Sequence, residues 1–101
     1  MIVSESELVA AVTRDHAAGK RIGLVRTRFD LVRVDLVRAI QAAAARSDRV
    51  VVAVIDDGGA APISAQDRAE LVDGFRGVDY VIICPKDSVD RLAGALAPDF
   101  P

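Results

Sequence analysis

A run of six apolar residues in the middle of the chain limits the folds that this sequence can adopt. Residues 50–55 read Val-Val-Val-Ala-Val-Ile, without a polar residue and with mostly β-branched side chains. A strand with one solvated face alternates apolar and polar residues, whereas a strand covered on both faces is apolar throughout. The run therefore predicts a buried strand in a parallel sheet that has helices on both faces.

The segments around this run alternate between helical and strand patterns. Ser4 and Glu7 have capping-box spacing before an apolar stripe, and Gly19 is a natural helix stop. We expect helices over 5–18, 34–46, 64 to about 75 and 88–96, and strands over 22–25, 50–55 and 78–84. This order favours right-handed crossovers between parallel strands. The sequence thus predicts one α/β domain over residues 1–101, Rossmann-like and three-layered, with a short parallel sheet.

The composition limits which partners this chain can be expected to bind and in which cellular compartment it is expected to work. The chain has 13 basic and 15 acidic residues, a balance that gives no electrostatic reason to expect nucleic acid or an anionic membrane. No apolar run approaches the roughly 20 residues that span a bilayer, and the N-terminus lacks a signal-peptide pattern. One histidine and one cysteine, Cys84, cannot complete a zinc site or an internal disulfide. We therefore expect a cytoplasmic protein without a bound metal.

Residues 27–36, which follow the first expected strand, resemble a known nucleotide-binding signature. They read T-R-F-D-L-V-R-V-D-L, similar to the G-x-F-D-x-x-H-x-G-H pattern of a nucleotidyltransferase family. That family includes the glycerol-3-phosphate cytidylyltransferases and the adenylyltransferase half of the heptose kinase/adenylyltransferases. Stretches 48–54, 62–71 and 78–82 resemble the same family in the same order. The resemblance implies strand order 3-2-1 and a degenerate nucleotide site.

The residues that would perform the family's chemistry are replaced. The resemblance implies two histidines at a helix N-terminus that stabilise phosphate charge, and a glycine between them that admits the triphosphate. Arg33, Asp35 and Leu36 occupy these positions. Leu36 has no group to donate, and Asp35 places a carboxylate near the expected triphosphate. Because losing one such donor costs about a hundred- to a thousandfold in rate, we expect no catalytic residues.

Several polar or aromatic residues remain as ligand-binding candidates by the resemblance. They are Thr27, Phe29, Asp30, Arg33, Asp57 and Arg68. Asp30 also suits a structural role in the turn, and Arg68 fits a solvated helix residue as well as a phosphate contact. Asp56 and Asp57 are compatible with Mg²⁺ bound together with a nucleotide, or with a plain turn beside the following glycines.

A basic cluster surrounds the same turn, formed by Arg26, Arg28, Arg33 and Arg38. One interpretation is a solvated face balanced by Asp30 and Asp35; the other is a rebuilt anion site. Outside this region, we expect His16 to be exposed and inert. Cys84, inside an apolar strand, is expected in the core.

The family's sheet continues with a fourth strand beside the first, whereas this sequence ends at Pro101. We therefore expect residues 21–27 to form an open edge that pairs with a second copy, as a homodimer, or with another protein. Arg21, Arg26 and Arg28 disfavour close self-pairing because like charges would gather there.

These features predict a degenerate cytidylyl/adenylyltransferase-like domain that acts as a non-catalytic interaction or regulatory module. The alternative is a nucleotide or sugar-phosphate binding domain that uses the arginine cluster. An active transferase with an altered site is a third reading, which the substitutions at Arg33, Asp35 and Leu36 disfavour.

Overall fold

The computed structural model describes residues 1–27, 34–56 and 64–100. Its strands are β1 (Ile22–Thr27), β2 (Arg49–Asp56) and β3 (Tyr80–Pro85). Its helices are α1 (Glu5–Ala17), α2 (Val34–Arg46), α3 (Ala65–Asp73) and α4 (Val89–Leu96), with a short 3-10 helix, η1 (Lys86–Ser88), before α4. The strands form a parallel sheet in the order β1-β2-β3. The expected α/β fold with a short parallel sheet is confirmed.

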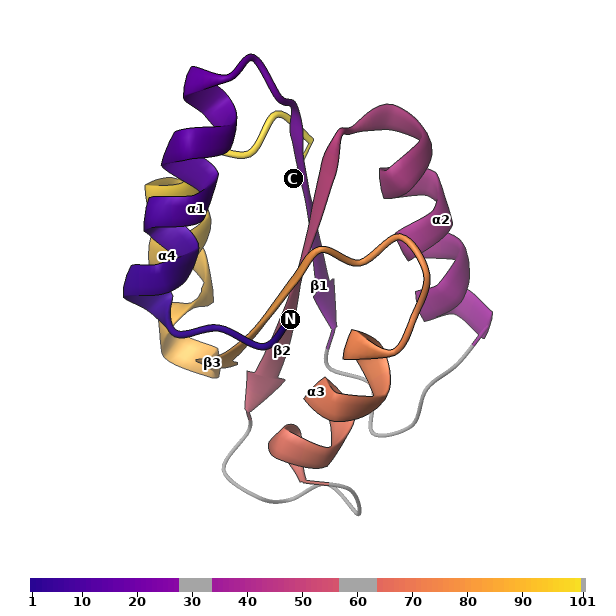
Figure 1. Ribbon diagram of the computed structural model, residues 1–101. Helices are drawn as coiled ribbons and strands as arrows, with labels where there is room; N and C mark the ends of the chain where they lie inside the picture. Colours follow the sequence, from indigo (N-terminus) through magenta and orange to yellow (C-terminus); the bar gives the residue numbers. More distant parts are fainter. Residues whose placement is uncertain (28–33, 57–63, 101) are drawn as a thin grey trace.

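The sheet separates two apolar layers. α1 and α4 lie on one face and α2 and α3 on the other (Figure 1). Val51, Ala53 and Ile55 of β2 join the core under α1 and α4, whereas Val50, Val52 and Val54 join the core under α2 and α3. Successive side chains of a strand point to opposite faces, so this uniformly apolar strand supplies both layers at once.

Two strand boundaries differ by two residues from those expected, and the others agree to within one residue. β1 runs two residues beyond Val25, because Arg26 and Thr27 still pair with Ala53 and Val54 of the longer β2. β3 begins at Tyr80 rather than at residue 78. The side chain of Asp79 accepts the Val50 N–H at 2.8 Å, in place of a backbone carbonyl. Pairing with β2 therefore determines where β1 ends and where β3 begins, and the hydropathy of these two segments does not.

Serine caps fix the starts of α1 and α3. Ser4 Oγ accepts from the Glu7 N–H at 3.2 Å, and Glu7 Oε1 accepts from the Ser4 N–H at 3.0 Å, so the expected capping box is present. The Ser4 N–H holds the pKa of Glu7 below its ordinary value. At α3, Ser64 Oγ accepts from the Asp67 N–H at 3.1 Å. These local bonds explain why both helix starts were visible in the sequence.

Each outer edge of the sheet is partly covered by one end of the described chain. At β3, the N-terminal residues pair in parallel with Val81 through its N–H and C=O. At β1, Asp99 and Phe100 pair in parallel with Ile22 and Leu24. The expectation that residues 21–27 form a wholly open edge is therefore wrong for the first half of β1.

None of the helices in the described ranges has both the length and the apolar character needed to cross a membrane.

Candidate functional site

The expected site lies where the three parallel strands end. Thr27 ends β1, Asp56 ends β2 and is paired with Pro85 at the end of β3. α2 and α3 start from this same end of the sheet (Figure 1). In open parallel sheets, ligands bind outside the carboxyl ends of the strands. We call this region the carboxyl edge.

Among the residues that replace the family's catalytic set, two are described. Leu36 lies in the first turn of α2 with 2% of its surface exposed. It belongs to the core cluster that also contains Ile40 and Val54. Asp35 is exposed in the same helical turn, where a carboxylate stabilises the helix dipole. Arg33 lies outside the described residues.

Arg68 is buried, with 5% of its surface exposed. It lies on α3, and its Nη2 donates to the Ile55 carbonyl oxygen near the end of β2 at 3.2 Å. A buried guanidinium is tolerated only where it is hydrogen-bonded. The interpretation of Arg68 as a solvated helix residue is therefore wrong, and its observed contact ties α3 to the end of β2.

The structure describes only some of the remaining residues that were expected to contact a ligand. Thr27 is buried at the end of β1, and Asp56 is exposed at the end of β2. Phe29, Asp30 and Asp57 lie outside the described residues, as does Arg28. Within the parts of the chain that the structure places, no three His, Cys, Asp or Glu side chains come together as metal ligands. The Mg²⁺ expectation involved Asp57 and stays a prediction.

The structure separates the described members of the arginine cluster. Arg26 Nη1 lies 2.8 Å from Asp90 Oδ1 of α4, an acidic partner outside the predicted cluster. Arg38 is exposed on α2, on the opposite face of the sheet from α4. Arg26 therefore has an acidic partner that the sequence did not predict, whereas Asp30, one of the two expected partners, lies outside the described residues. The sequence carried no signal for the partner, because Asp90 is 64 residues away.

His16 has a partner that its sequence context did not reveal. Its Nε2 lies 3.3 Å from Asp99 Oδ2, and the same oxygen accepts from the Ile22 N–H at 2.7 Å. The Ile22 N–H holds the pKa of Asp99 below its ordinary value, with His16 contributing. His16 is half-buried, so the expectation of an exposed residue is wrong, whereas its expected inertness stays a prediction.

A second polar group lies near the amino ends of the strands. Tyr80 Oη donates to Asp15 Oδ2 at 3.1 Å, and Arg49 Nε lies 3.8 Å from the same carboxylate. Burial, reinforced by the Asp15 carboxylate, raises the pKa of Tyr80. The group joins α1 to β2 and β3. Because it lies far from the carboxyl edge, we read it as structural.

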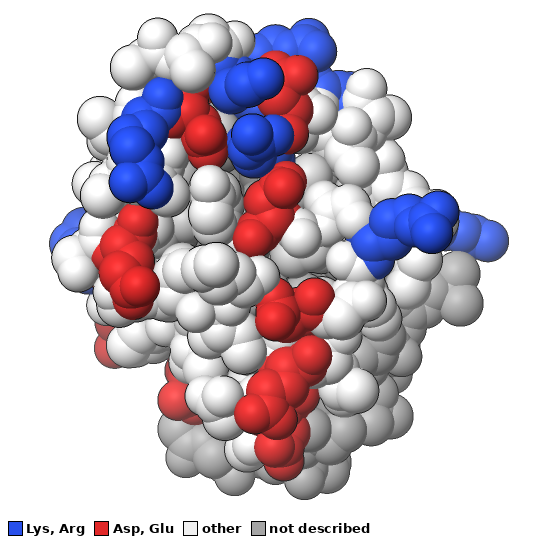
Figure 2. Space-filling model, in the orientation of Figure 1, with Lys and Arg blue, Asp and Glu red and all other residues white. Residues whose placement is uncertain are grey.

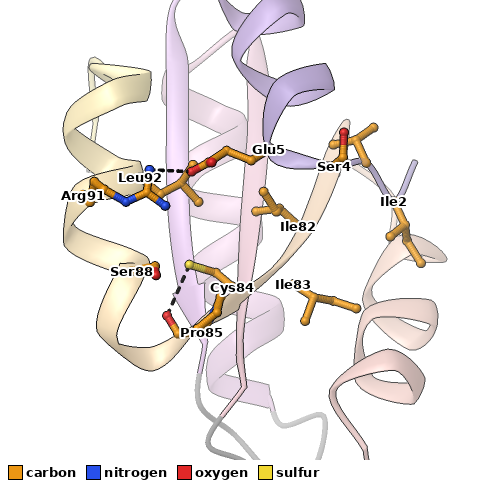
Figure 3. A pocket seen from close by; sticks show the side chains of 11 residues that line it. Ile2, Ser4, Glu5, Ile82, Ile83, Cys84, Pro85, Ser88, Arg91 and Leu92 are labelled. Carbon is orange, nitrogen blue, oxygen red and sulfur yellow. Dashed lines mark hydrogen bonds and ion pairs between the residues drawn. The ribbon is translucent and has the colours of Figure 1, made fainter.

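A hollow of about 250 Å³ lies between the N-terminal residues, β3 and α4 (Figure 3). Arg91 and Glu5 form an ion pair of 2.9 Å at its margin. Cys84 points toward this region from β3, and its Sγ donates to the Pro85 carbonyl oxygen at 3.4 Å. Burial raises the pKa of the Cys84 thiol, which opposes reactivity. The expectation that Cys84 belongs to the core is confirmed.

The face that carries the β3 edge bears both signs of charge. Figure 2 shows acidic side chains in a band down this face, with basic side chains mainly toward its upper part and sides. Such interleaving gives no broad field of one sign to attract a polyanion.

Comparisons with known proteins identify homologues of this chain and a solved structure with a similar fold. No family model matches the chain. The chain is 35% identical over 106 residues to the bifunctional protein HldE of Alkalilimnicola ehrlichii and 34% identical to that of Halorhodospira halophila. Each alignment covers 97% of this chain but only 22% of the relative's length.

A solved structure supports the same conclusion at the level of fold. A lipopolysaccharide core biosynthesis protein from Thermoplasma volcanium superposes with a TM-score of 0.71, covering 80% of this chain and 71% of that one. At 18% identity the match shows a shared fold alone. The chain is therefore homologous to a segment of the bifunctional protein HldE along nearly its whole length, and it has a nucleotidyltransferase-like α/β fold.

Proposed function

We propose that this chain is a non-catalytic nucleotidyltransferase-like domain that acts as an interaction or regulatory module. It corresponds in this proposal to the adenylyltransferase part of its relatives, folds as one domain over residues 1–101, and works in the cytoplasm. The motif order in residues 27–82 supports the first point. The single cysteine fits a reducing compartment.

The observation that carries the proposal is the burial of Leu36. By the resemblance, this position should present a histidine to the phosphates. Leu36 instead has 2% of its surface exposed and is part of the core under α2. A polar donor aimed at a ligand has been replaced by an apolar side chain that packs, so the position stabilises the fold instead of a transition state.

Asp35 supports the same conclusion through charge. It is an exposed carboxylate in the first turn of α2, a place where a helix otherwise attracts anions. A carboxylate there satisfies the helix dipole and repels a polyphosphate, since both are negative. The same substitution therefore favours the helix and disfavours a nucleotide.

The alternative is a nucleotide or sugar-phosphate binder that uses the arginine cluster. Arg38 favours it, because this side chain is exposed on the helix that begins at the carboxyl edge. Arg26 weakens it, because this side chain is already paired with Asp90.

A thermal-shift titration with CTP and ATP, each with and without Mg²⁺, separates the two proposals. We expect no shift at millimolar nucleotide and no pyrophosphate release. A ligand at a hundred times its Kd would add about 2.7 kcal/mol of stability, which is a shift of several degrees. A shift of that size, lost in Arg33→Ala but kept in the surface control Arg14→Ala, would establish the binder instead. Pyrophosphate release would overturn both.

A further inference from the structure

The two helices on one face of the sheet have a hollow between them. α2 and α3 both pack on the strands of this face (Figure 1), and a space of about 300 Å³ lies between the middle of α2 and the end of α3. We call this space the α2–α3 hollow. The residues that line it lie well inside the chain and are Val37, Ile40, Gln41, Gly74, Phe75 and Arg76. On the opposite face, α1 and α4 contact each other and are joined by the ion pair of Glu5 and Arg91.

Leu71 lies beside this hollow and is exposed. It is on α3, one helical turn before Gly74 and Phe75, which line the hollow. Among the residues with described positions, Leu71 and Met1 are the large apolar side chains that stay exposed, Leu71 to 50%. A single exposed leucine is ordinary on a protein surface. A leucine beside a largely apolar hollow, however, gives one face both a projecting apolar side chain and a space of the same character.

Charges of opposite sign lie on the two sides of the hollow. Asp67, Glu70 and Leu71 are spaced by three and four residues, so they share one side of α3. Arg76 belongs to the wall of the hollow, and Arg38 lies on α2 next to the residues that line it. All four charged side chains are exposed, and none is in an ion pair with another described residue. The face therefore carries acidic groups on α3 and basic groups across the hollow.

We propose that the face formed by α2 and α3 binds a second copy of this chain in a two-fold dimer. Leu71 of each copy enters the α2–α3 hollow of the other, and Glu70 meets Arg76 of the second copy. Asp67 extends the same acidic side toward Arg38. This proposal rests on the interaction role proposed above, and it places the second copy on the helices rather than on the edge of β1.

A second copy suits this face better than a different molecule because the face is complementary to itself. A two-fold contact brings a surface patch against the same patch of the other copy, so the patch must contain both halves of every interaction. Here the projecting leucine and the hollow are neighbours, and so are the acidic and basic groups. The hollow is at the small end of the volumes that enclose ligands, which suits one inserted side chain.

The first test removes the projecting side chain. Sedimentation velocity of the whole chain over a concentration series measures dimerisation. Leu71→Ala should raise the Kd of the dimer by at least about tenfold, because truncating a buried apolar anchor removes much of the affinity of an interface. Position 71 is exposed in the single chain, so the circular dichroism spectrum should not change. A Leu71→Ala chain that dimerises as well as the wild type would overturn the proposal. A wild-type chain that stays monomeric would overturn it in favour of a different protein as the occupant.

A charge exchange tests whether the contact is reciprocal. Glu70→Arg and Arg76→Glu should each raise the Kd by about tenfold or more, because each variant alone places like charges opposite each other at both symmetric contacts. An equal mixture of the two variants should dimerise about as well as the wild type, because both contacts of the mixed dimer again pair an acid with a base. The matched control is Arg14→Glu on the exposed side of α1, which should change the Kd less than about twofold.

A mixture that dimerises no better than either variant alone would overturn the proposed geometry. The outcome for the proposed function is separate. Nucleotide turnover by a chain that still dimerises would refute the non-catalytic role and leave this interface standing. A monomeric chain without turnover would refute the interface and leave the non-catalytic role.

Discussion

The two edges of the sheet are protected in different ways. At β3, the covering segment pairs with one residue, Val81, and then turns away into a capped helix, and Pro85 at the end of the strand has no N–H to offer. At β1, the covering segment still runs parallel to the strand at Phe100, where the described chain stops. One cover thus departs into a helix after a single pairing residue, whereas the other is still in register with its strand at the last described residue. Substitutions at both edges test this contrast.

The largest expected effect concerns the strands themselves. Ile22 of β1 is fully buried, whereas Ile83 of β3 is only partly buried. Ile22→Ala should lower the free energy of unfolding by about 2–5 kcal/mol, and Ile83→Ala by less than about 2 kcal/mol. Urea unfolding monitored by circular dichroism measures both. Equal losses would show that the β3 edge is as deeply integrated in the core as β1.

The next effect concerns the side chain that holds the C-terminal segment. Asp99→Ala removes the acceptor of the Ile22 N–H and the partner of His16, so we expect a lower Tm than for the wild type. Asp99→Asn, which keeps one acceptor oxygen, should lower the Tm less. If Asp99→Ala leaves the Tm unchanged, the backbone bonds alone hold this segment.

The same carboxylate gives a pH dependence. Because the Ile22 N–H lowers the pKa of Asp99, the folded state binds this proton more weakly than the unfolded state does. The stabilisation is therefore complete above the unfolded pKa, about 3.9, and is lost as pH falls through the lower folded pKa. The Tm difference between wild type and Asp99→Asn should shrink below about pH 4. A constant difference would assign the effect to packing.

A smaller and opposite effect is expected where the C-terminal segment leaves α4. Ala97 has φ of +47°, a left-handed conformation that costs a residue with a Cβ about 1–2 kcal/mol. Ala97→Gly should raise the free energy of unfolding by up to about 1 kcal/mol, since glycine also loses more backbone entropy. Chemical denaturation is the measurement, with Ala95→Gly inside α4 as the control that should destabilise.

The smallest effect on stability is expected at Pro85. Pro85→Ala restores an N–H to the β3 edge and should change the free energy of unfolding by less than about 1 kcal/mol. Self-association should nevertheless rise, which light scattering across a concentration series will detect. If the variant stays as monodisperse as the wild type, proline is not what protects this edge.

The sequence predicted those elements that depend on hydrogen bonds between neighbouring residues or on an unbroken apolar run. The apolar run 50–55 identified the central strand, and the Ser4–Glu7 spacing identified the start of α1, because both depend on residues close in the chain. The site was less predictable. The burial of Arg68 depends on the end of β2, and the bond from Ile22 to Asp99 joins residues 77 apart. Spacing rules carry no information about such distant pairs.

The positions of the two chain ends bear on how the protein should be handled. The first residues lie beside β3 and the last described residues beside β1 (Figure 1). A purification tag or fluorescent reporter fused ahead of Met1 would emerge at the edge that carries Pro85. The same fusion joined at the other end of the chain would lie close to the backbone pairing between Phe100 and β1. Reporter orientation is thus itself an experimental variable for this molecule.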